Sequence, residues 1–407
     1  MPHGPNAQRN LLRNAASGCR PAAGGFSLVE RRACAFLAAL VFFLFTISAA
    51  AKVEIPAPRL DATSYVLYEQ DSGRVLAESN ADERVEPASI TKVMTVYVAG
   101  HALREGIISL DEEVVVSEKA WKMEGSRMFI EVGTRVTVDE LLEGIIVQSG
   151  NDASVALAEH ISGTEEVFAG LMTEQAQRLG MKNTSFANAT GLPDPNTYTT
   201  ARDLALLAAA LVRDFPELYA RFASKEYTYN EIRQPNRNRL LYRDDSVDGI
   251  KTGHTEAAGY CLLSSAKRDG MRLIAAVMGA DSDTARTEAS QALLNYGFRF
   301  FETREIYRAE AVLAEPRVWG GAAETLPVGP AQAVALTIPR GRYDDLSAEA
   351  TLAEPLRAPV GKGQRVGSMA IRLEGETLAE IELVALRDVA EGSLFSRLYD
   401  ELMLLLE

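Results

Sequence analysis

The stretch Pro87-Ala88-Ser89-Ile90-Thr91-Lys92 decides how the rest of the chain is interpreted. The spacing of Ser89 and Lys92 places both side chains on one face of a helix, one turn apart. A neutral lysine amine can take the proton of a serine hydroxyl and so activate it as a nucleophile. Pro87 suits a helix start, and the mostly apolar residues 93–98 predict a buried helix with the Ser/Lys pair at its exposed beginning. Alone, such a pair is weak evidence, because it occurs often by chance or as a helix cap.

Two later stretches strengthen this interpretation. Ser149-Gly150-Asn151 lies at the junction of two predicted helices, and Lys251-Thr252-Gly253 lies on a predicted strand. Each has an ordinary structural explanation, a helix N-cap for the first and an edge strand for the second. In this order and at this spacing, however, the three stretches are the motif set of penicillin-binding proteins and serine β-lactamases.

From about residue 55 to 407 the chain resembles D-alanyl-D-alanine carboxypeptidases, the low-molecular-mass penicillin-binding proteins. The resemblance extends beyond the three motifs to residues 148–153, 248–255, 295–302, 338–342 and 391–395. It implies an α+β fold: a β-lactamase/transpeptidase-like domain, with an antiparallel sheet and helices, followed by a small all-β domain and a C-terminal amphipathic helix.

The resemblance also implies an activity and assigns residues to it. A serine-type carboxypeptidase would remove the terminal D-Ala from peptidoglycan stem pentapeptides through an acyl-enzyme on Ser89, and β-lactams would acylate the same serine. Lys92, kept neutral by its surroundings and by the nearby Lys251 cation, would be the base, and Ser149 would relay the proton. The residues assigned to substrate binding are Asn151, Lys251, Thr252, Gly253, His254, Arg286 and Arg237. Backbone N–H groups of Ser89 and His254 would form the oxyanion hole, and no metal or organic cofactor is expected.

Other functions on the same fold stay open. A D,D-endopeptidase differs only in the bond that its pocket accepts, and a catalytically silent wall-binding protein would keep the fold without the chemistry. A β-lactamase needs a base for rapid deacylation, yet the loop of residues 186–200 offers Asp194 and no glutamate. One departure from the family lies in this loop, where Thr190 precedes Gly191-Leu192 and related chains often have histidine.

Domain boundaries follow from changes in composition. Residues 1–51 are predicted to be a signal peptide with an extended n-region, because arginines precede an uncharged run that ends in small residues. An uncleaved membrane anchor is the alternative. Residues 52–305 are predicted to form the penicillin-binding catalytic domain, residues 306–390 a β-domain, and residues 391–407 an amphipathic helix.

Period and turn signals predict the elements of the catalytic domain. Strands at its start (65–68, 74–77) and end (249–252, 260–265, 271–277) predict an antiparallel sheet built from both chain ends. Helices are predicted over residues 151–161, 203–212 and 286–301, with a capping box at Thr137 and Glu140 opening another through Ile146. Residues 186–200, rich in Asn, Thr, Gly and Pro, predict a long surface loop.

Charge and cysteine usage limit the partners. Five arginines against one glutamate give residues 1–51 a net charge of +4, so the formal total of −14 leaves −18 for the rest. Such an acidic body is not expected to bind nucleic acid. Without the signal segment Cys261 is the sole cysteine; it excludes an internal disulfide and is expected to be a buried, inert thiol.

The C-terminal segment has large apolar residues at helical spacing from Leu394 to Leu406. Such a helix can lie in a membrane interface, or it can dock on the protein or on another subunit. Only Arg397 is basic there, against Asp400, Glu401 and Glu407, so attraction to anionic lipid would be poor. Together with the signal segment, this helix predicts an exported protein at the periplasmic face of the cytoplasmic membrane, bound peripherally.

Overall fold

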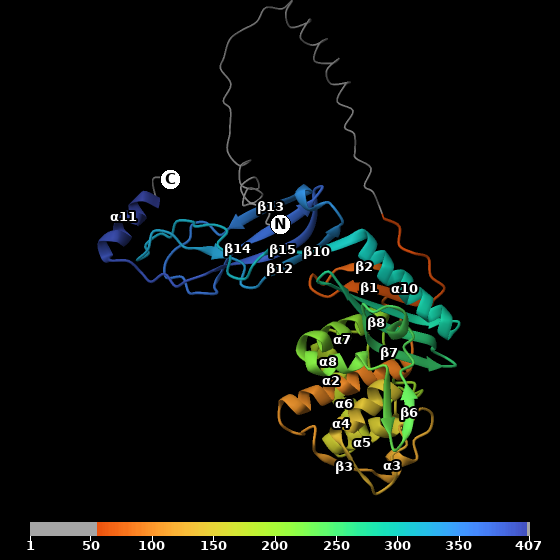
Figure 1. The fold of residues 1–407 in the computed structure, drawn as a ribbon. Helices are drawn as coiled ribbons and strands as arrows, with labels where there is room; N and C mark the ends of the chain where they lie inside the picture. The colour runs from red at the N-terminus through yellow and green to blue at the C-terminus, as the bar shows by residue number, and fades with distance from the viewer. Residues whose placement is uncertain (1–54, 405–407) are drawn as a thin grey trace, which may run out of the picture.

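The computed structural model describes residues 55–404, so the predicted signal segment lies outside the described residues. Figure 1 shows a catalytic body of helices around a sheet, a β-rich body beside it, and the last helix at the far end of the β-rich body. The predicted α+β class, the second β-domain and the terminal helix are confirmed. Within residues 55–404, no helix combines the length and the apolar character needed to cross a bilayer.

The central sheet of the catalytic body is antiparallel, with strand order β2-β1-β9-β8-β7. Its strands are β1 (Ser64–Glu69), β2 (Val75–Ser79), β7 (Val247–Thr255), β8 (Gly259–Arg268) and β9 (Met271–Ala280). Strand β1 pairs with β9, for example Leu67 with Ala275, so both ends of the domain meet in the sheet as predicted. Strand β7 is left at the edge.

Alternation along the strands gives the sheet two covered faces. On β1, Val66 packs into one core with Leu204 of α7 (Ala201–Asp214), whereas Leu67 packs into the other core with Leu293 of α10 (Asp283–Phe300). Successive strand residues point to opposite faces, so one apolar strand serves both cores. The α7 side also holds α2 (Thr91–Arg104), the predicted buried helix, with eleven buried residues.

The helical region is formed by the part of the chain that lies between β2 and β7 in sequence. It contains η1 (Ala88–Ile90), α3 (Glu118–Trp121), α4 (Val138–Glu143), η2 (Gly144–Gln148), α5 (Asn151–Ser162), α6 (Glu165–Arg178), α8 (Pro216–Ala220), η3 (Arg221–Ala223) and α9 (Leu240–Arg243), with hairpins β3 (Glu113–Val115)/β4 (Arg135–Thr137) and β5 (Glu226–Tyr229)/β6 (Ile232–Pro235). The capping box of Thr137 and Glu140 is present. The helix it opens does not continue regularly through Ile146, because the chain widens into the π-helical turn η2 at Gly144.

The β-domain has its own core. Strand β10 (Phe301–Tyr307) pairs with β12 (Val334–Pro339), and a second sheet has the order β11-β15-β14-β13. The second sheet contains β11 (Val328–Gly329), β13 (Leu346–Leu352), β14 (Arg365–Leu373) and β15 (Glu376–Ala385), with η4 (Tyr343–Asp345) before β13. Since β10 begins at Phe301, pairing with this domain starts a few residues before the predicted boundary at residue 306. Helix α11 (Leu394–Leu404) follows it.

Candidate active site

The Ser/Lys pair lies where the helical region meets the sheet edge, because η1 packs against β7. Ser89 is half-buried in the short helix η1, and the preceding Ala88 has a φ of +47°. A non-glycine residue in that region is strained, a condition often found beside reactive groups. Lys92 is the second residue of α2, and its side chain is only 1% exposed. The expectation of an exposed helix start is therefore wrong for Lys92, because the strand β7 and the loop of residues 186–200 close over it.

The Lys92 amine is held by three oxygen atoms. Its Nζ donates to Asn151 Oδ1 at 2.7 Å and to the carbonyl oxygen of Thr190 at 2.6 Å, and it lies 3.2 Å from Ser89 Oγ. A neutral amine has two N–H groups and one lone pair. The amide and the carbonyl, which can only accept at those atoms, use both N–H groups and leave the lone pair for the Ser89 hydroxyl.

The surroundings of Lys92 favour this neutral form. Burial, followed by the Arg237 cation, lowers the pKa of Lys92 to about 7, while the carboxylates of Asp152 and Glu165 oppose the shift. The sequence hypothesis named Lys251 as the neighbouring cation; Lys251 and Lys92 do interact electrostatically, and the structure adds Arg237 as a cation that lowers the pKa of Lys92. Lys251 is itself buried, and its pKa is lowered by burial first and then by Lys92, Arg237 and Arg286.

The second motif presents one free hydroxyl and one fully engaged amide. Ser149, in the left-handed region with a φ of +66°, is buried, and its Oγ has no hydrogen-bond partner among the described residues. Asn151, the first residue of α5, accepts from Lys92 and donates through Nδ2 to the carbonyl of Glu124 at 2.6 Å. In this structure Asn151 thus orients Lys92, in addition to any contact that it makes with substrate.

The loop of residues 186–200 is not a surface loop in its middle part, contrary to expectation. Ala189, Thr190 and Gly191 are buried against η1 and α2. Gly191 has a φ of +77°, and a Cβ there would lie 1.8 Å from the carbonyl oxygen of Ala88. The side-chain oxygen of Asn188 accepts N–H groups of Thr190 and Gly191, so polar groups of the loop are satisfied internally. The loop consequently delivers a backbone carbonyl to Lys92.

The third motif lies on the edge strand β7, beside the Ser/Lys pair. A Cβ on Gly253 would meet the carbonyl oxygen of Pro87 at 3.0 Å and Ala88 Cβ at 3.1 Å, so the strand passes directly along η1. Lys251 and Thr252 are buried on this strand, whereas His254 is exposed and its ring lies 4.1 Å from that of Tyr260. The predicted residues of all three motifs therefore meet at one cleft.

Arg286 braces the sheet edge from α10. Its guanidinium is buried and donates to the carbonyl oxygens of Gly253 and Cys261, on paired strands, at 2.9 and 3.2 Å. It also forms an ion pair with Asp283 at 2.5 Å. Because its guanidinium is buried, Arg286 is a structural brace of the sheet edge and not an exposed surface ion pair.

Arg237 lines a neighbouring pocket together with Arg286 and donates to Ser126 Oγ at 2.7 Å. The pocket of about 370 Å³ is lined by Asn236, Arg237, Arg239, His254, Tyr260, Asp283 and Arg286. Its positive side chains suit an anionic group of a ligand that enters past β7. Among residues 55–404, no group of three His, Cys, Asp or Glu residues could hold a metal ion.

Comparison with known proteins identifies the family. Residues 50–282 match the family described as D-alanyl-D-alanine carboxypeptidase, and residues 301–391 match the C-terminal domain of penicillin-binding protein 5. The D-alanyl-D-alanine carboxypeptidase DacC of Escherichia coli K12 is 46% identical over 371 residues, which cover 89% of this chain and 93% of the relative. The chain belongs to the D-alanyl-D-alanine carboxypeptidase family.

More distant relatives and solved structures of this family agree. The carboxypeptidase DacF of Bacillus subtilis 168 is 38% identical over 338 residues, covering 82% of this chain and 87% of the relative. The structure of penicillin-binding protein 5 from Haemophilus influenzae superposes with a TM-score of 0.81 at 42% identity, covering 83% of this chain and 100% of that one. The predicted family, fold class and enzyme class, a serine-type carboxypeptidase, are confirmed.

Sequence reasoning missed residues that shape the carboxypeptidase site without touching a ligand. Asp152, buried on α5, accepts the N–H groups of Met128 and Phe129 and so fixes the loop before β4. Glu165, buried at the start of α6, accepts the N–H of Ala189 at 3.0 Å and pairs with Lys119. Asp152 directly follows a motif residue, which was a usable signal; Glu165 is distant in sequence and had none.

Proposed function

We propose that this chain releases the terminal D-Ala of peptidoglycan stem pentapeptides by way of an acyl-enzyme on Ser89. The Ser89 hydroxyl oxygen attacks the penultimate D-Ala carbonyl carbon while Lys92 Nζ takes its proton. The observation that carries this assignment is the hydrogen bonding of Lys92. Its two N–H groups have carbonyl-type acceptors, and its remaining position faces Ser89 Oγ at 3.2 Å.

The tetrahedral intermediate then collapses as the carbon–nitrogen bond breaks. The leaving D-Ala amine needs a proton, and the unpartnered hydroxyl of Ser149 is suited to pass it from Lys92 to that nitrogen. Backbone N–H groups of Ser89 and His254 are assigned to the developing negative charge on oxygen. Both groups come from elements that lie against each other, because Gly253 of β7 packs on η1.

The substrate's terminal carboxylate is assigned to the Lys251–Thr252 end of the cleft. Lys251 is buried beside other cations, and an incoming carboxylate would supply the negative charge that stabilises its protonated form. Arg237 and Arg286, which both line the neighbouring pocket, add positive charge. The proposed carboxylate-binding residues therefore carry an excess of positive charge that a bound carboxylate would neutralise.

Deacylation requires water to attack the ester, with its proton passing to Lys92 and the Ser89 hydroxyl restored. The histidine that related chains often carry is replaced by Thr190, but the group that contacts Lys92 here is the backbone carbonyl of that residue. Asp194 does not offer a lactamase-like base, because its carboxylate accepts the N–H of Asn196 within its own turn. Slow release of β-lactams follows.

The substrate assignment is tested by incubating the protein with purified pentapeptide and, separately, with a cross-linked dimer of stem peptides. The products are identified by mass spectrometry. Free D-Ala from the pentapeptide supports the carboxypeptidase. Cleavage confined to the cross-linked substrate would instead identify a D,D-endopeptidase.

Hydrolysis of nitrocefin distinguishes the third candidate, a β-lactamase. A single slow burst fits a penicillin-binding protein, and fast multiple turnover fits a β-lactamase. Penicillin-binding protein D2 of Listeria monocytogenes, 29% identical with a TM-score of 0.55 and covering 60% of this chain, has a structure in the ampicillin-bound form, which supports β-lactam acylation here.

We also propose that the protein is exported and that α11 holds it at the outer face of the cytoplasmic membrane. The signal-like residues 1–51 support export. Large apolar side chains on α11 are exposed: Leu394, Phe395, Leu398, Tyr399 and Leu402. Transferring such side chains out of water is worth roughly 1.5–3 kcal/mol each before ordering costs.

Deletion of residues 393–407 tests this anchor. Cells that express the full chain should retain it in the membrane fraction, and the truncated form should move to the soluble fraction with unchanged activity on small peptides. Binding by apolar area should persist at high salt. A truncated form that stays on the membrane would show that another segment, such as an uncleaved N-terminus, is the anchor.

A further inference from the structure

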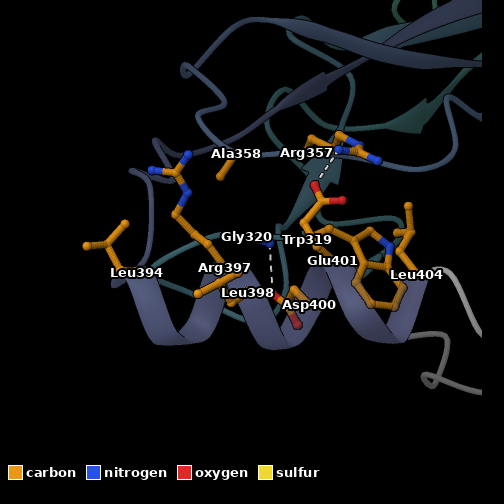
Figure 2. Close-up of a pocket in the computed structure, with 10 residues that line it drawn as sticks. All are labelled: Trp319, Gly320, Arg357, Ala358, Leu394, Arg397, Leu398, Asp400, Glu401 and Leu404. Carbon is orange, nitrogen blue, oxygen red and sulfur yellow. Dashed lines mark hydrogen bonds and ion pairs between the residues drawn. The ribbon is translucent and has the colours of Figure 1, made fainter.

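The hydrogen bonds and ion pairs that attach helix α11 to the β-domain come from its polar residues. Three large apolar side chains of the helix point away from the domain: Phe395 is 88%, Tyr399 61% and Leu402 58% exposed. No residue of the helix is buried. A helix docked by packing would bury its apolar stripe against the domain. Figure 2 shows instead an open pocket of about 410 Å³ between α11 and the domain, which Leu394, Leu398 and Leu404 line without closing it and which the charged side chains of Asp400 and Glu401 bridge.

Asp400 makes the principal contact. One carboxylate oxygen lies 2.8 Å from the Arg317 guanidinium. The other accepts the backbone N–H of Gly320 at 2.8 Å, as Figure 2 shows. The Asp400 side chain is 13% exposed, and Arg317 also stacks on Trp319 with its guanidinium carbon 4.0 Å from the ring centre. Charge-assisted bonds withdrawn from water are stronger than exposed ion pairs. We name this arrangement the Asp400 clamp.

The remaining contacts of α11 are weaker. Glu401 pairs with Arg357 at 2.6 Å, and both side chains are more than half exposed, so this pair contributes little. The start of the helix is fixed by the N–H of Gly392, which donates to the Gly320 carbonyl at 2.9 Å. Gly320 is thus a common attachment point for the segment before α11 and for Asp400 near its end.

We infer that the Asp400 clamp pre-forms the lipid-binding surface, holding α11 helical and its apolar face outward before a bilayer is met. This inference rests on the proposed membrane anchoring. An isolated helix of this length is marginal in water, so an unclamped segment would have to order at the surface at a cost in affinity. The clamp also pairs two acidic residues with arginines, which removes the repulsion they would otherwise exert on lipid and fits a bilayer surface as the occupant.

The direction in which Asp400→Asn changes membrane affinity separates this inference from an effect of net charge alone. Charge alone predicts that Asp400→Asn leaves binding to phosphatidylcholine vesicles unchanged and strengthens binding to anionic ones. The clamp predicts that Asp400→Asn and Arg317→Gln each weaken partitioning into phosphatidylcholine vesicles, by about 3- to 30-fold for a lost bond to a charged group. The double variant should bind no more weakly than the weaker single one. Without lipid, amides of residues 394–404 should exchange faster in both variants.

Two control variants keep the outcomes distinct. Glu401→Gln should bind almost as the unaltered protein does, because its ion pair is exposed. The variant that combines Phe395→Ser and Leu398→Ser should lose its partitioning into vesicles. Unchanged binding of this variant would overturn the proposed anchor itself.

The clamp inference is overturned, and the anchor stands, if that double variant loses binding while Asp400→Asn binds lipid and exchanges its amides as the unaltered protein does. A lipid-free dimer that Leu398→Ser dissociates would replace the bilayer by a second copy as the occupant.

Discussion

Lys92 is the residue on which the proposed chemistry depends, and its protonation is set by a few named groups. Burial and the Arg237 cation lower its pKa to about 7, while the Glu165 carboxylate opposes them. The base form is therefore present above about pH 7 and is lost as the pH falls. Below that pKa, the acylation rate should decrease about tenfold per pH unit.

Two substitutions are expected to shift the acid limb of the pH–rate profile, which is the fall in acylation rate below the pKa of Lys92, in opposite directions. Arg237→Gln removes a cation, so the pKa of Lys92 should rise and the limb should move to higher pH. Glu165→Gln removes a carboxylate but keeps an acceptor for the Ala189 N–H, so the limb should move to lower pH. The second-order rate of acylation by benzylpenicillin, measured against pH, reports both. Limbs that stay fixed, or that move in the same direction, would contradict the assignment of Lys92 as the titrating base.

Sequence was sufficient to propose the reacting residues but not to find their partners. Ser89, Lys92, Ser149 and Lys251 were found because their side-chain chemistry is visible in the spacing of three motifs. The acceptor at Thr190 is a backbone carbonyl, which every residue has, so no residue type signalled it. Likewise, the cation beside Lys92 depends on tertiary distance, and Arg237 could not be preferred over Lys251 from sequence.

At the scale of elements, the site is made by close approach of η1, β7 and the loop of residues 186–200. Gly253 permits β7 to pass along η1, and Gly191 permits the loop to do so from the other side. Both approaches involve Ala88, the residue before Ser89: Gly191 lies against its carbonyl oxygen and Gly253 against its Cβ. Small residues at two positions far apart in sequence thus set the shape of one cleft.

Gly191→Ala should damage this approach. Its Cβ would lie 1.8 Å from the Ala88 carbonyl oxygen, so the loop and the Thr190 carbonyl must move. We expect acylation to fall by about 10²-fold, the scale of an ångström-sized misplacement. Gly180→Ala is the matched control, because it has the same φ of +77° and nothing within 4 Å. Both variants should lose about 1 kcal/mol of stability from the backbone strain. Equal acylation rates in the two variants would contradict the role given to the loop.

The elements themselves were largely predictable. Strand periodicity and the capping box at Thr137 predicted the sheet and α4, because these signals are local. The loop of residues 186–200 was assigned to the surface from its polar composition. Its polar side chains instead satisfy the loop's own backbone, as Asn188 does for Thr190 and Gly191, and this allows burial.

At the scale of the whole molecule, a buried polar cluster joins the catalytic body to the β-domain. Glu69 of β1 is fully buried, and one carboxylate oxygen accepts the hydroxyls of Ser72 at 2.6 Å and of Thr337, on β12, at 2.9 Å. Arg74 donates to the Thr337 carbonyl at 2.6 Å. These contacts couple the two bodies at the side of the sheet opposite to β7.

Thr337→Val tests this junction. It keeps the side-chain shape and removes a donor to a buried carboxylate, so unfolding free energy should fall by about 1.5–3 kcal/mol. Activity on small peptides should be retained, because β9 and β8 separate the cluster from the catalytic edge. Thr351→Val, on the exposed side of β13, should change stability by less than about 0.5 kcal/mol. Thermal or denaturant unfolding measures both, and equal stabilities of the two variants would show that the cluster does not stabilise the junction.

The central claim, that Ser89 is the acylated nucleophile, is tested most directly by mapping the covalent adduct. The protein is quenched after brief exposure to benzylpenicillin, digested, and analysed by peptide mass spectrometry. The account predicts a single penicilloyl adduct on the peptide that contains Ser89, and its absence from Ser89→Ala. An adduct on any other residue of the unaltered protein, or undiminished labelling of Ser89→Ala, would contradict it.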